Sequence, residues 1–364
     1  MSQESSKQLL SSPRADIASV RLGGRLVGAD AACYVIAEAG ANHDRDFTTA
    51  LRLIDVAVAA GADAVKFQTY SGRNLYSTKT PRFDYLGDLG EKPVHELLDD
   101  IALPREWQPK LAAHCADVGI EFLSSPFDRD AVDELDELDV AAFKIASFEL
   151  VDIPLIEYAA SKGRPLILST GMASMGEIDE AMQAATAAGA GGVCLLQCAS
   201  LYPAPPAIMN LRSMASMAAA FGVPVGLSDH TLGLHVAAAG VALGARLLEK
   251  HFTLDRSRPG PDHRFAIEPG ELRELVAHVR DVESALGDGV KRGPSDEEAV
   301  EMYRKARRSV IAACVIPAGT EITREMLTIK RPGFGIKPKY VDTLVGRRAR
   351  VDIDEDDIIT WDMV

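Results

Sequence analysis

Short apolar runs recur along the chain and alternate with longer stretches in which apolar residues return every three or four positions. A short apolar run fits a buried strand, whereas the 3.6-residue period fits an amphipathic helix. Strands that alternate with helices indicate a parallel sheet of βαβ units, and eight of them predict an α/β fold of the (β/α)8 TIM-barrel type. The runs are "YVIAEAG" (34–40), "AVKFQTY" (64–70), "EFLSSPF" (121–127), "AFKIASF" (142–148), "PLILSTG" (165–171), "VCLLQCA" (193–199), "PVGLSDH" (224–230) and "RLLEKHF" (246–252).

Each apolar run ends in side chains that are able to do chemistry. The carboxyl ends of barrel strands meet at one mouth, where the active site lies in essentially every characterised barrel enzyme. Eight polar ends in the same register therefore favour one convergent site. The residues are Glu38, Asn42, His43, Lys66, Gln68, Ser124, Ser125, Lys144, Ser147, Glu149, Ser169, Thr170, Gln197, Ser200, Tyr202, Ser228, Asp229, His230, Glu249, Lys250 and His251.

Two histidines end neighbouring strands of the predicted barrel. His230 and His251 could share a divalent ion, with Glu38, Glu249 or Asp229 and water as further ligands. Two strong protein ligands leave positions open for substrate, which suits a Lewis acid better than a structural zinc. The alternative is that both imidazoles only make hydrogen bonds.

Two lysines lie among apolar neighbours, in "VKFQ" and "FKIA". Burying a lysine without a partner costs several kcal/mol or neutralises it. Lys66 and Lys144 therefore favour a site for an anion with several oxygens, to which Ser147, Ser169 and Ser228 add hydroxyl donors. A structural ion pair and a Schiff-base lysine are the alternatives; the histidine pair argues against the Schiff base, because a metal activates carbonyls in a different way.

Loops and the C-terminal segment complete the predicted organisation. The long connection between the second and third strands, 71–100, is expected to form a lid or a wall of the site, and Asp262 in "GPDHRF" is either a turn residue or a sugar contact. We expect a tail at 1–20, the barrel at 21–288, a charged linker at 289–306 and a small β-rich domain at 307–364. In this last domain "KRPGFGIKPKY" presents Arg331, Lys337 and Lys339.

Charge and cysteine usage restrict the partners and the compartment. The 364 residues have a formal net charge of −14, which argues against nucleic acid or an anionic membrane as the main partner. No apolar run reaches the roughly 18 residues of a membrane helix, and the N-terminus lacks the apolar core of a secretory signal. The five cysteines are scattered among apolar residues, so we expect no disulfides and a cytoplasmic location.

Several motifs, in this order, resemble the sialic acid synthase family, also called the N-acetylneuraminate or nonulosonate synthases. They are "IAEAGANHD", "GADAVKFQTY", "SSPF", "KIASFE", "LSTGM", "YPAPP", "GLSDHTLG", "EKHFTLDRSRPGPDH" and "KRPGFGIKP". The resemblance covers nearly the whole chain, and its last part is similar to the SAF (antifreeze-like) domain. It implies a metal-dependent condensation of phosphoenolpyruvate with an open-chain 2-acetamido hexose such as N-acetylmannosamine, with release of phosphate by C–O cleavage.

The resemblance also implies roles for individual residues. His230 and His251 would hold Mn2+, with Mg2+ or Co2+ as alternatives, and Glu38 would act as acid or base at the aldehyde. Arg331 would reach the barrel of a partner subunit in a domain-swapped homodimer. Tyr202 and Asp262 would contact the acceptor sugar. Phosphoenolpyruvate would be held by Lys66, Gln68, Ser125, Lys144, Ser147, Ser169 and Ser228.

The family pattern is not followed at every position, and the acceptor sugar is left open. "NHD" stands where Asn-His-Asn-Gly is common, while "KIASFE" and Ser200 look more like pseudaminate synthases and "RPGPDH" looks like the neuraminate and legionaminate branches. A pseudaminate or legionaminate synthase acting on a 2,4-diacetamido-trideoxy hexose is therefore the alternative within the class. A Schiff-base sialate aldolase or lyase, and a barrel that only binds, are alternatives from other classes.

Overall fold

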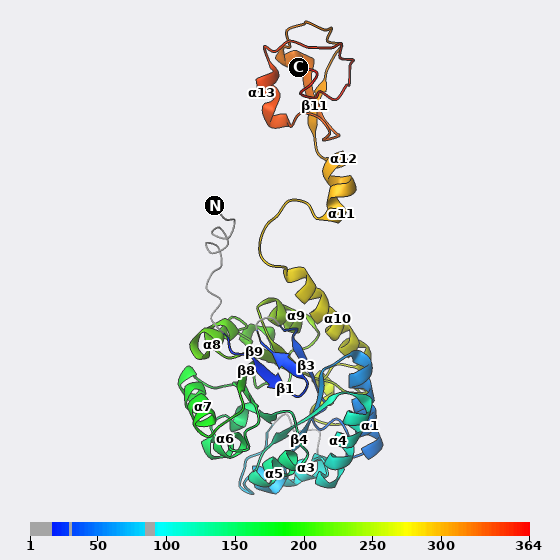
Figure 1. The fold of residues 1–364 in the computed structure, drawn as a ribbon. Coiled ribbons are helices and arrows are strands. Elements are labelled where there is room, and N and C mark those ends of the chain that lie inside the picture. The colour runs from blue at the N-terminus through cyan, green and yellow to red at the C-terminus, as the bar shows by residue number, and fades with distance from the viewer. Residues whose placement is uncertain (1–16, 29–30, 84–91) are drawn as a thin grey trace. The chain divides into compact units, whose positions relative to one another are not determined.

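The computed structural model describes residues 17–28, 31–83 and 92–364, and the chain divides into two compact units, one up to Gly287 and one from Asp288 to Val364 (Figure 1). In the first unit, eight parallel strands form one sheet in the order β5-β4-β3-β10-β9-β8-β7-β6. The outermost strands of this order, β5 and β6, also lie in contact, which closes the sheet into the predicted barrel. The strands are β3 (Tyr34–Glu38), β4 (Ala64–Thr69), β5 (Glu121–Pro126), β6 (Phe143–Ile145), β7 (Leu166–Ser169), β8 (Val193–Cys198), β9 (Val225–Asp229) and β10 (Leu247–His251).

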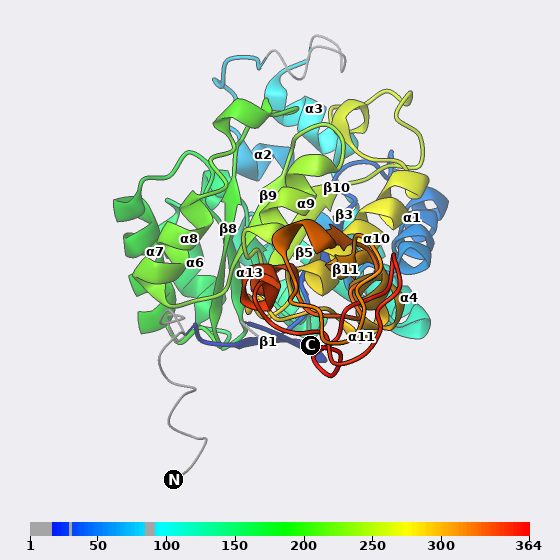
Figure 2. The ribbon, with the colours of Figure 1, turned by 90° about the horizontal axis from the view of Figure 1, so that it is seen from above.

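Helices surround the strands on the outside (Figure 2). Local signals in the sequence set several of their ends: the Asp46 carboxylate caps the start of α1, and Gly61 ends that helix in a left-handed conformation. Ser174 and Glu177 form a capping box at the start of α7. The outer helices are α1 (Phe47–Ala60), α4 (Gln108–Val118), α5 (Arg129–Glu137), α6 (Ile153–Ala160), α7 (Met175–Ala187), α8 (Ser213–Phe221), α9 (His235–Ala242) and α10 (Pro269–Leu286).

Alternation along each strand divides the barrel interior into two levels. Side chains near the strand starts, such as Tyr34, Ile167 and Leu247, form an apolar cluster inside the barrel. Polar side chains further along the same strands line a cavity, as Glu38 does on β3 and Glu249 on β10. The barrel interior is therefore filled by apolar side chains near the amino-terminal ends of the strands and lined by polar side chains near their carboxyl ends.

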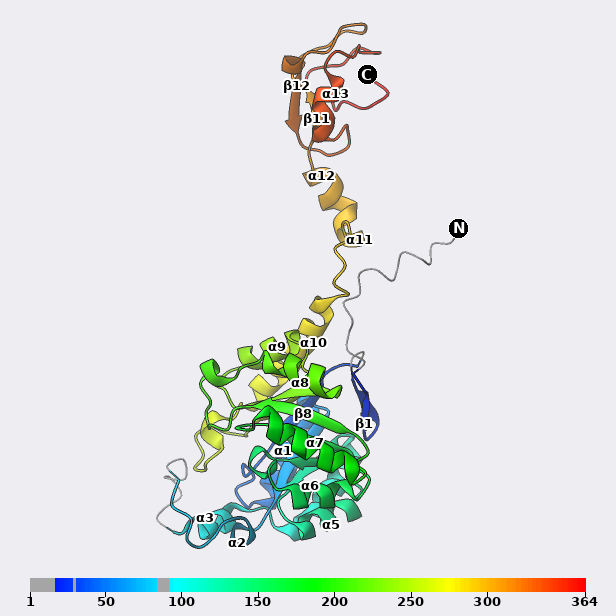
Figure 3. The same ribbon diagram turned by 90° about the vertical axis from the view of Figure 1, so that its left-hand side faces the viewer.

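An antiparallel hairpin closes the amino-terminal end of the barrel. It consists of β1 (Val20–Leu22) and β2 (Arg25–Val27), whose Val20, Leu22 and Val27 side chains are buried in the lower apolar cluster. Val20 thus begins a strand at the position where we had expected the tail to end. Figures 2 and 3 show β1 at the end of the barrel opposite to α2 (Gly72–Leu75) and α3 (Val94–Ile101).

The connection between β4 and β5 carries these two short helices. They form a small apolar cluster of their own, in which Tyr70, Val94, Leu97 and Leu98 are buried and Leu75 is partly buried. Residues 84–91 of this connection lie outside the described residues. The described part of this connection, which was expected to form a lid or a wall of the site, therefore has a small apolar core of its own.

The C-terminal unit begins with short helical turns, α11 (Asp296–Glu298), η7 (Ala299–Tyr303) and α12 (Arg304–Ala306). An antiparallel pair follows, β11 (Ser309–Ala312) with β12 (Leu327–Lys330), and α13 (Val341–Leu344) comes after it. Isolated bridges, including Ile316 with Ile353, add further β contacts. Twelve buried apolar residues, among them Val310, Ile353 and Leu344, form its separate core.

Candidate active site

A polar cavity lies at the carboxyl ends of the barrel strands. Every strand of the barrel delivers at least one lining residue, directly or from the turn that follows it. This arrangement confirms the expected barrel mouth, because the lining residues come from segments that are far apart in the sequence. They are Glu38, Lys66, Gln68, Ser125, Phe127, Lys144, Ala146, Ser147, Ser169, Cys198, Tyr202, Ser228, His230, Glu249 and His251.

Glu38 and Lys66 form a buried ion pair on neighbouring strands. The Lys66 Nζ lies 2.7 Å from the Glu38 Oε2 and donates a hydrogen bond of 3.2 Å to the Ser125 Oγ. The Gln68 amide nitrogen donates to the other Glu38 oxygen over 2.9 Å. Burial nevertheless raises the pKa of the Glu38 carboxyl to about 7, although Lys66 opposes this. A carboxyl that titrates near neutral pH is suited to take up and release a proton.

Lys144 is buried at the same level, and among the described residues no carboxylate lies within ion-pair distance of it. Its Nζ donates to the Ser169 Oγ over 2.7 Å and to the Ile145 carbonyl over 3.0 Å. Burial lowers the pKa of its ammonium group. Because its hydrogen-bond acceptors are neutral, this ammonium group can still bind an anionic ligand.

Glu249 contributes the second carboxylate of the cavity. Its Oε1 accepts a hydrogen bond of 3.3 Å from the Ser228 Oγ and lies 3.8 Å from the Lys66 Nζ. Burial opposes its ionisation, but Lys144, Lys66 and His230 together lower the pKa of the Glu249 carboxyl. Its Oε2 is buried without a hydrogen-bond partner in the described structure. The cavity thus combines a fixed negative charge with two lysines.

His230 and His251 lie next to each other at the cavity, with ring centroids 5.3 Å apart. The His230 Nδ1 lies 2.9 Å from the Ala199 carbonyl and donates to it, which fixes a tautomer with a free lone pair on Nε2. Burial opposes protonation of His230, yet the neighbouring Cys198 and the Ala199 carbonyl raise its pKa on balance. Burial lowers the pKa of the His251 imidazole well below its ordinary range, so this ring is neutral.

Asp262 lies beside His251 and is held there by a loop contact. Its Oδ2 is 3.5 Å from the His251 Nδ1, and Gly40 leaves the space, because a Cβ at that glycine would come within 2.7 Å of the same oxygen. The next residue, His263, lies 2.8 Å from the Asp44 Oδ1 through its Nε2. This contact fastens the loop after β10 to the loop after β3.

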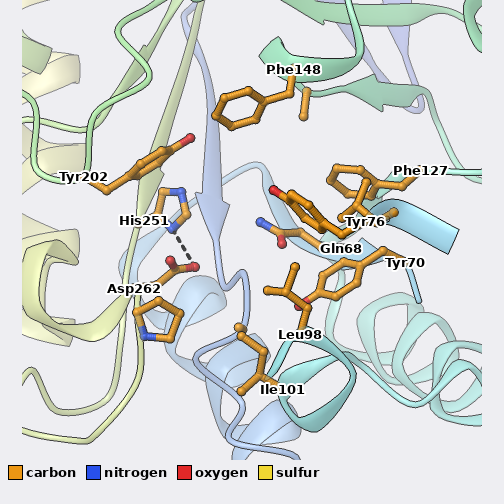
Figure 4. A pocket seen from close by; sticks show the side chains of 14 residues that line it. Gln68, Tyr70, Tyr76, Leu98, Ile101, Phe127, Phe148, Tyr202, His251 and Asp262 are labelled. Carbon is orange, nitrogen blue, oxygen red and sulfur yellow. Dashed lines mark ion pairs between the residues drawn. The ribbon is translucent and has the colours of Figure 1, made fainter. Parts of the chain in front are cut away.

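A second cavity, called the outer cavity below, adjoins the first and is lined in part by α2 and α3 (Figure 4). The two cavities share Gln68, Phe127, Ala146, Tyr202 and His251, so one space continues into the other. The walls of the outer cavity are largely apolar and aromatic, with Asp262 as its acidic group. Its other lining residues are Ala41, Tyr70, Leu75, Tyr76, Leu98, Ile101, Phe148 and Pro261.

Several predicted site residues do not line the polar cavity. Asp229 is one of them: its Oδ2 lies 2.7 Å from the Lys250 Nζ and its Oδ1 accepts from the Thr231 amide, so the structure places it in an ion pair with Lys250. Ser200 lines a neighbouring pocket. Burial raises the pKa of Glu149 to about 7, but its side chain is not among the lining residues. Arg331 belongs to the C-terminal unit.

Some lining residues escaped the sequence reasoning. Cys198 lines the polar cavity with its Sγ 3.7 Å from the His230 Nδ1, and the alternation along β8 could have placed it there. Tyr70 and Phe127, directly after β4 and β5, line the outer cavity, and their position at strand ends was the available signal. Tyr76 and Leu98 could not be assigned, because their approach depends on how the long connection folds.

Comparison with known proteins places this arrangement in a family. A model of the NeuB family matches residues 53–291, and a model of the SAF domain matches residues 307–364. The chain belongs to the NeuB family. The expected resemblance is therefore confirmed, as is the combination of a barrel with a small SAF domain.

Relatives in this family are named for different products. The chain is 39% identical to the N,N'-diacetyllegionaminic acid synthase of Campylobacter jejuni, over 89% of this chain and 98% of the relative. It is 37% identical to the human N-acetylneuraminate-9-phosphate synthase, with coverages of 94% and 95%. It is 36% identical to a pseudaminic acid synthase of Campylobacter jejuni, with coverages of 91% and 96%. The three identities are too similar to one another to decide which of these synthases the chain resembles in its acceptor sugar.

A solved structure supports the same assignment. The N-acetylneuraminic acid (sialic acid) synthetase of Leptospira borgpetersenii, in complex with citrate, superposes with a TM-score of 0.71 at 32% identity. The superposition covers 78% of this chain and 94% of that chain. The described residues contain no helix that is long and apolar enough to span a membrane.

Proposed function

We propose that this member of the NeuB family is a nonulosonate synthase that condenses phosphoenolpyruvate with an open-chain, unphosphorylated 2-acetamido hexose. The observation that carries the proposal is the pair of buried lysines, Lys66 and Lys144, at the base of a cavity that continues into a larger, less polar one. An anion with two charged groups fits the first space and a neutral sugar fits the second. N-acetylmannosamine is the reference acceptor, and a 2,4-diacetamido-trideoxy hexose is the alternative.

Phosphoenolpyruvate would occupy the polar cavity. Its phosphate and carboxylate need cationic and hydroxyl donors, and the two lysines with Ser125, Ser169 and Ser228 supply both kinds. Ser147 and Gln68 also face this space. Binding of the anion would bring an opposite charge to Lys144, for which the described part of the chain supplies no carboxylate at ion-pair distance.

The histidine pair fits a divalent metal such as Mn2+, with Mg2+ or Co2+ as alternatives. His230 is held in the tautomer that leaves Nε2 free, and the buried Nδ1 of His251 has no hydrogen-bond partner in the described structure. The described residues contain no group of three or more His, Cys, Asp or Glu side chains that could hold a metal ion by themselves. Water and substrate would therefore complete the coordination. When bound there, the ion would supply Lewis-acid polarisation of the acceptor aldehyde.

The reaction requires carbon–carbon bond formation and cleavage of a carbon–oxygen bond. C3 of phosphoenolpyruvate attacks the aldehyde carbon, water adds to C2, and the C2–O bond to phosphate breaks, so that phosphate leaves with the former enol oxygen. Glu38, with a pKa of about 7, would exchange a proton with the aldehyde oxygen as it becomes a hydroxyl. The two lysines would hold the anionic groups in place while charge shifts towards phosphate.

One observation favours a different class, a Schiff-base aldolase or lyase acting on sialic acid. Burial lowers the pKa of Lys144, and a neutral amine is what a Schiff base needs. The two hypotheses differ in what they consume, because an aldolase does not use phosphoenolpyruvate. Borohydride with sialic acid would trap a Schiff base on the lysine, whereas the proposed synthase would not be labelled.

The test is phosphate release from phosphoenolpyruvate with Mn2+ in the presence of N-acetylmannosamine or a 2,4-diacetamido-trideoxy hexose. We expect release that depends on the acceptor and is abolished by a chelator. Release that persists after chelation and dialysis would remove the metal from the proposal. Silence with all acceptors, together with borohydride trapping by sialic acid, would favour the aldolase.

We further propose that the protein acts in the cytoplasm as a domain-swapped homodimer. The support is the SAF-domain match at 307–364 and the resemblance that assigns Arg331 to the partner's barrel. Sedimentation equilibrium of the full chain would test the dimer. Activity restored by mixing an Arg331→Ala chain with a His251→Ala chain would test the exchange of the domain, because one barrel of the mixed dimer would then be complete.

A further inference from the structure

Two consecutive residues in the turn after β3 have a backbone conformation that residues other than glycine rarely adopt. Asp44 and Arg45 both have φ angles of +51°, in the left-handed region. This region costs free energy for residues with a Cβ, and aspartate tolerates it better than arginine does. Such residues persist only where the surrounding structure fixes them, and they gather at functional sites. The contacts of these two side chains therefore indicate what the turn does.

The two preceding residues fix the body of this turn to the barrel. The Asn42 amide nitrogen donates a hydrogen bond of 2.8 Å to the Phe252 carbonyl, and both residues are buried. The His43 ring is buried as well, and its Nδ1 accepts a hydrogen bond of 3.0 Å from the Arg45 backbone amide. The turn is therefore a fixed point from which the Asp44 and Arg45 side chains extend.

Asp44 holds the loop after β10. Its Oδ1 lies 2.8 Å from the His263 Nε2, and its Oδ2 lies 2.8 Å from the Arg258 Nη1. The buried His263 ring is held on its other side by the Thr253 hydroxyl, which lies 2.7 Å from Nδ1. His263 directly follows Asp262, which lines the outer cavity. The contacts of Asp44 therefore restrict where the Asp262 carboxylate lies.

Arg45 holds a different wall of the outer cavity. Its Nη1 donates a hydrogen bond of 2.6 Å to the Asp99 carbonyl near the end of α3. The Asp99 Oδ1 accepts a hydrogen bond of 2.5 Å from the Gly72 amide at the start of α2, which joins the two helices. Leu98 and Ile101, before and after Asp99 on α3, line the cavity (Figure 4). The contact of Arg45 therefore restricts where these two side chains lie.

We propose that Asp44 and Arg45 are positioning residues that hold two walls of the outer cavity at a fixed separation, so that an acceptor sugar meets phosphoenolpyruvate in one geometry. This inference rests on the proposed synthase activity. Neither side chain is among the described residues that line the two cavities, so both act through the walls that they hold. Loss of either contact would let one wall move, and the reacting carbons would then be aligned less often.

The test uses substitutions that separate the backbone conformation from the side-chain contacts. Asp44→Gly adopts this φ angle without strain and removes both contacts, whereas Asp44→Asn keeps an oxygen that can accept from the His263 Nε2. Asp139→Gly is the matched control, because Asp139 also has a left-handed φ angle, 56°, and accepts from the Arg164 Nη1 over 2.8 Å but lines neither cavity. Phosphate release from phosphoenolpyruvate is measured with the full-length protein, Mn2+ and N-acetylmannosamine or a 2,4-diacetamido-trideoxy hexose.

We expect Asp44→Gly to lower kcat/KM for the acceptor by about 10- to 100-fold, because a small misplacement of a substrate has a cost of that size. Asp44→Asn should recover most of this loss. The KM for phosphoenolpyruvate and the melting temperature should change no more than they do in Asp139→Gly. An unchanged acceptor kcat/KM in Asp44→Gly, equal losses for both substrates, or no recovery in Asp44→Asn would overturn the positioning role.

Hydrogen–deuterium exchange provides a readout that does not depend on turnover. Asp44→Gly should speed the exchange of backbone amides at residues 260–267 and leave α3 unchanged, whereas Arg45→Gly should do the reverse. Unchanged exchange, or the same increase in both segments with either variant, would overturn the two separate contacts. Absence of phosphate release by the wild-type protein with every acceptor would count against the synthase activity, and the exchange pattern would still decide whether this turn holds two walls.

Discussion

Two buried lysines on the barrel strands should respond in opposite ways to the same substitution. Within residues 17–28, 31–83 and 92–364, Lys144 has hydroxyl and carbonyl acceptors but no carboxylate at ion-pair distance, whereas the Lys250 Nζ lies 2.7 Å from the Asp229 Oδ2. Methionine has a similar length and no charge. We expect Lys144→Met to stabilise the ligand-free protein and Lys250→Met to destabilise it.

The magnitudes follow from what each substitution leaves behind. Burying an ammonium costs several kcal/mol. The Ser169 and Ile145 hydrogen bonds return only about 1 kcal/mol each, and the attraction of Glu249 offsets a further part, so Lys144→Met should gain about 1 kcal/mol. This corresponds to a rise in melting temperature of about 2–4 °C for each kcal/mol. Lys250→Met leaves the Asp229 carboxylate buried and unpaired, which should cost about 3–5 kcal/mol.

The sign of the pH dependence provides a second measurement. Burial lowers the folded-state pKa of Lys144 below its value in the unfolded chain, which is about 10.4. The loss of folding stability caused by the buried ammonium group is therefore fully present at pH values below the folded-state pKa. This loss disappears as the pH rises towards the unfolded-state pKa. The stabilisation by Lys144→Met should therefore be larger at pH 7 than at pH 9.5.

Thermal unfolding of both variants without substrate, followed by titration calorimetry with phosphoenolpyruvate, checks these expectations. Lys144→Met should weaken phosphoenolpyruvate binding by at least about tenfold, because a charge-assisted hydrogen bond contributes about 1.5–3 kcal/mol. A Lys144→Met protein that melts lower than wild type would refute the account of a buried charge that is only partly compensated. A more stable variant with unchanged affinity would remove Lys144 from the anion site.

Three further predictions concern other positions. His251→Ala should abolish turnover and weaken Mn2+ binding in a calorimetric titration without changing the circular dichroism of the fold, and a variant that still turns over would contradict the metal assignment. Arg331→Ala should raise the KM for the acceptor sugar and leave the KM for phosphoenolpyruvate unchanged; equal acceptor KM values for variant and wild type would exclude that arginine from the site. Glu149→Gln should stabilise the ligand-free protein by about 1–2 kcal/mol at pH 8 and by less at pH 5. The reason is that burial raises the folded-state pKa of Glu149 to about 7, whereas its pKa in the unfolded chain is about 4.3. The stability of the wild-type protein therefore falls as the pH rises from about 4.3 towards 7, and the variant is free of this loss. Denaturant unfolding at the two pH values would check this, and a gain that is larger at pH 5 would contradict it.

Periodicity in the sequence was enough to predict the barrel, because each strand is a short apolar run with its own helix. The hairpin of β1 and β2 was missed, although Gly23 and Gly24 between two short apolar pieces are a known turn signal. The walls of the outer cavity were out of reach for a different reason. Leu98 and Ile101 reach the cavity only through the path of a long connection, and no local pattern fixes such a path.

The case of Asp229 shows where reasoning from strand ends needs a further step. All polar residues at the ends of β9 and β10 were assigned to the mouth, yet successive side chains of a strand point to opposite faces. Ser228 and Glu249 therefore line the cavity, while Asp229 and Lys250, one position further along, face away and pair with each other. Leu247, at the start of β10, belongs to the apolar cluster inside the barrel. Every second residue after it, Glu249 and then His251, faces the same side and lines the cavity, whereas Lys250 faces the opposite side. The same alternation applies to Lys144. Ala142, two positions before it, lies in the apolar cluster inside the barrel, so Lys144 faces the cavity and its charge is expected to meet a ligand.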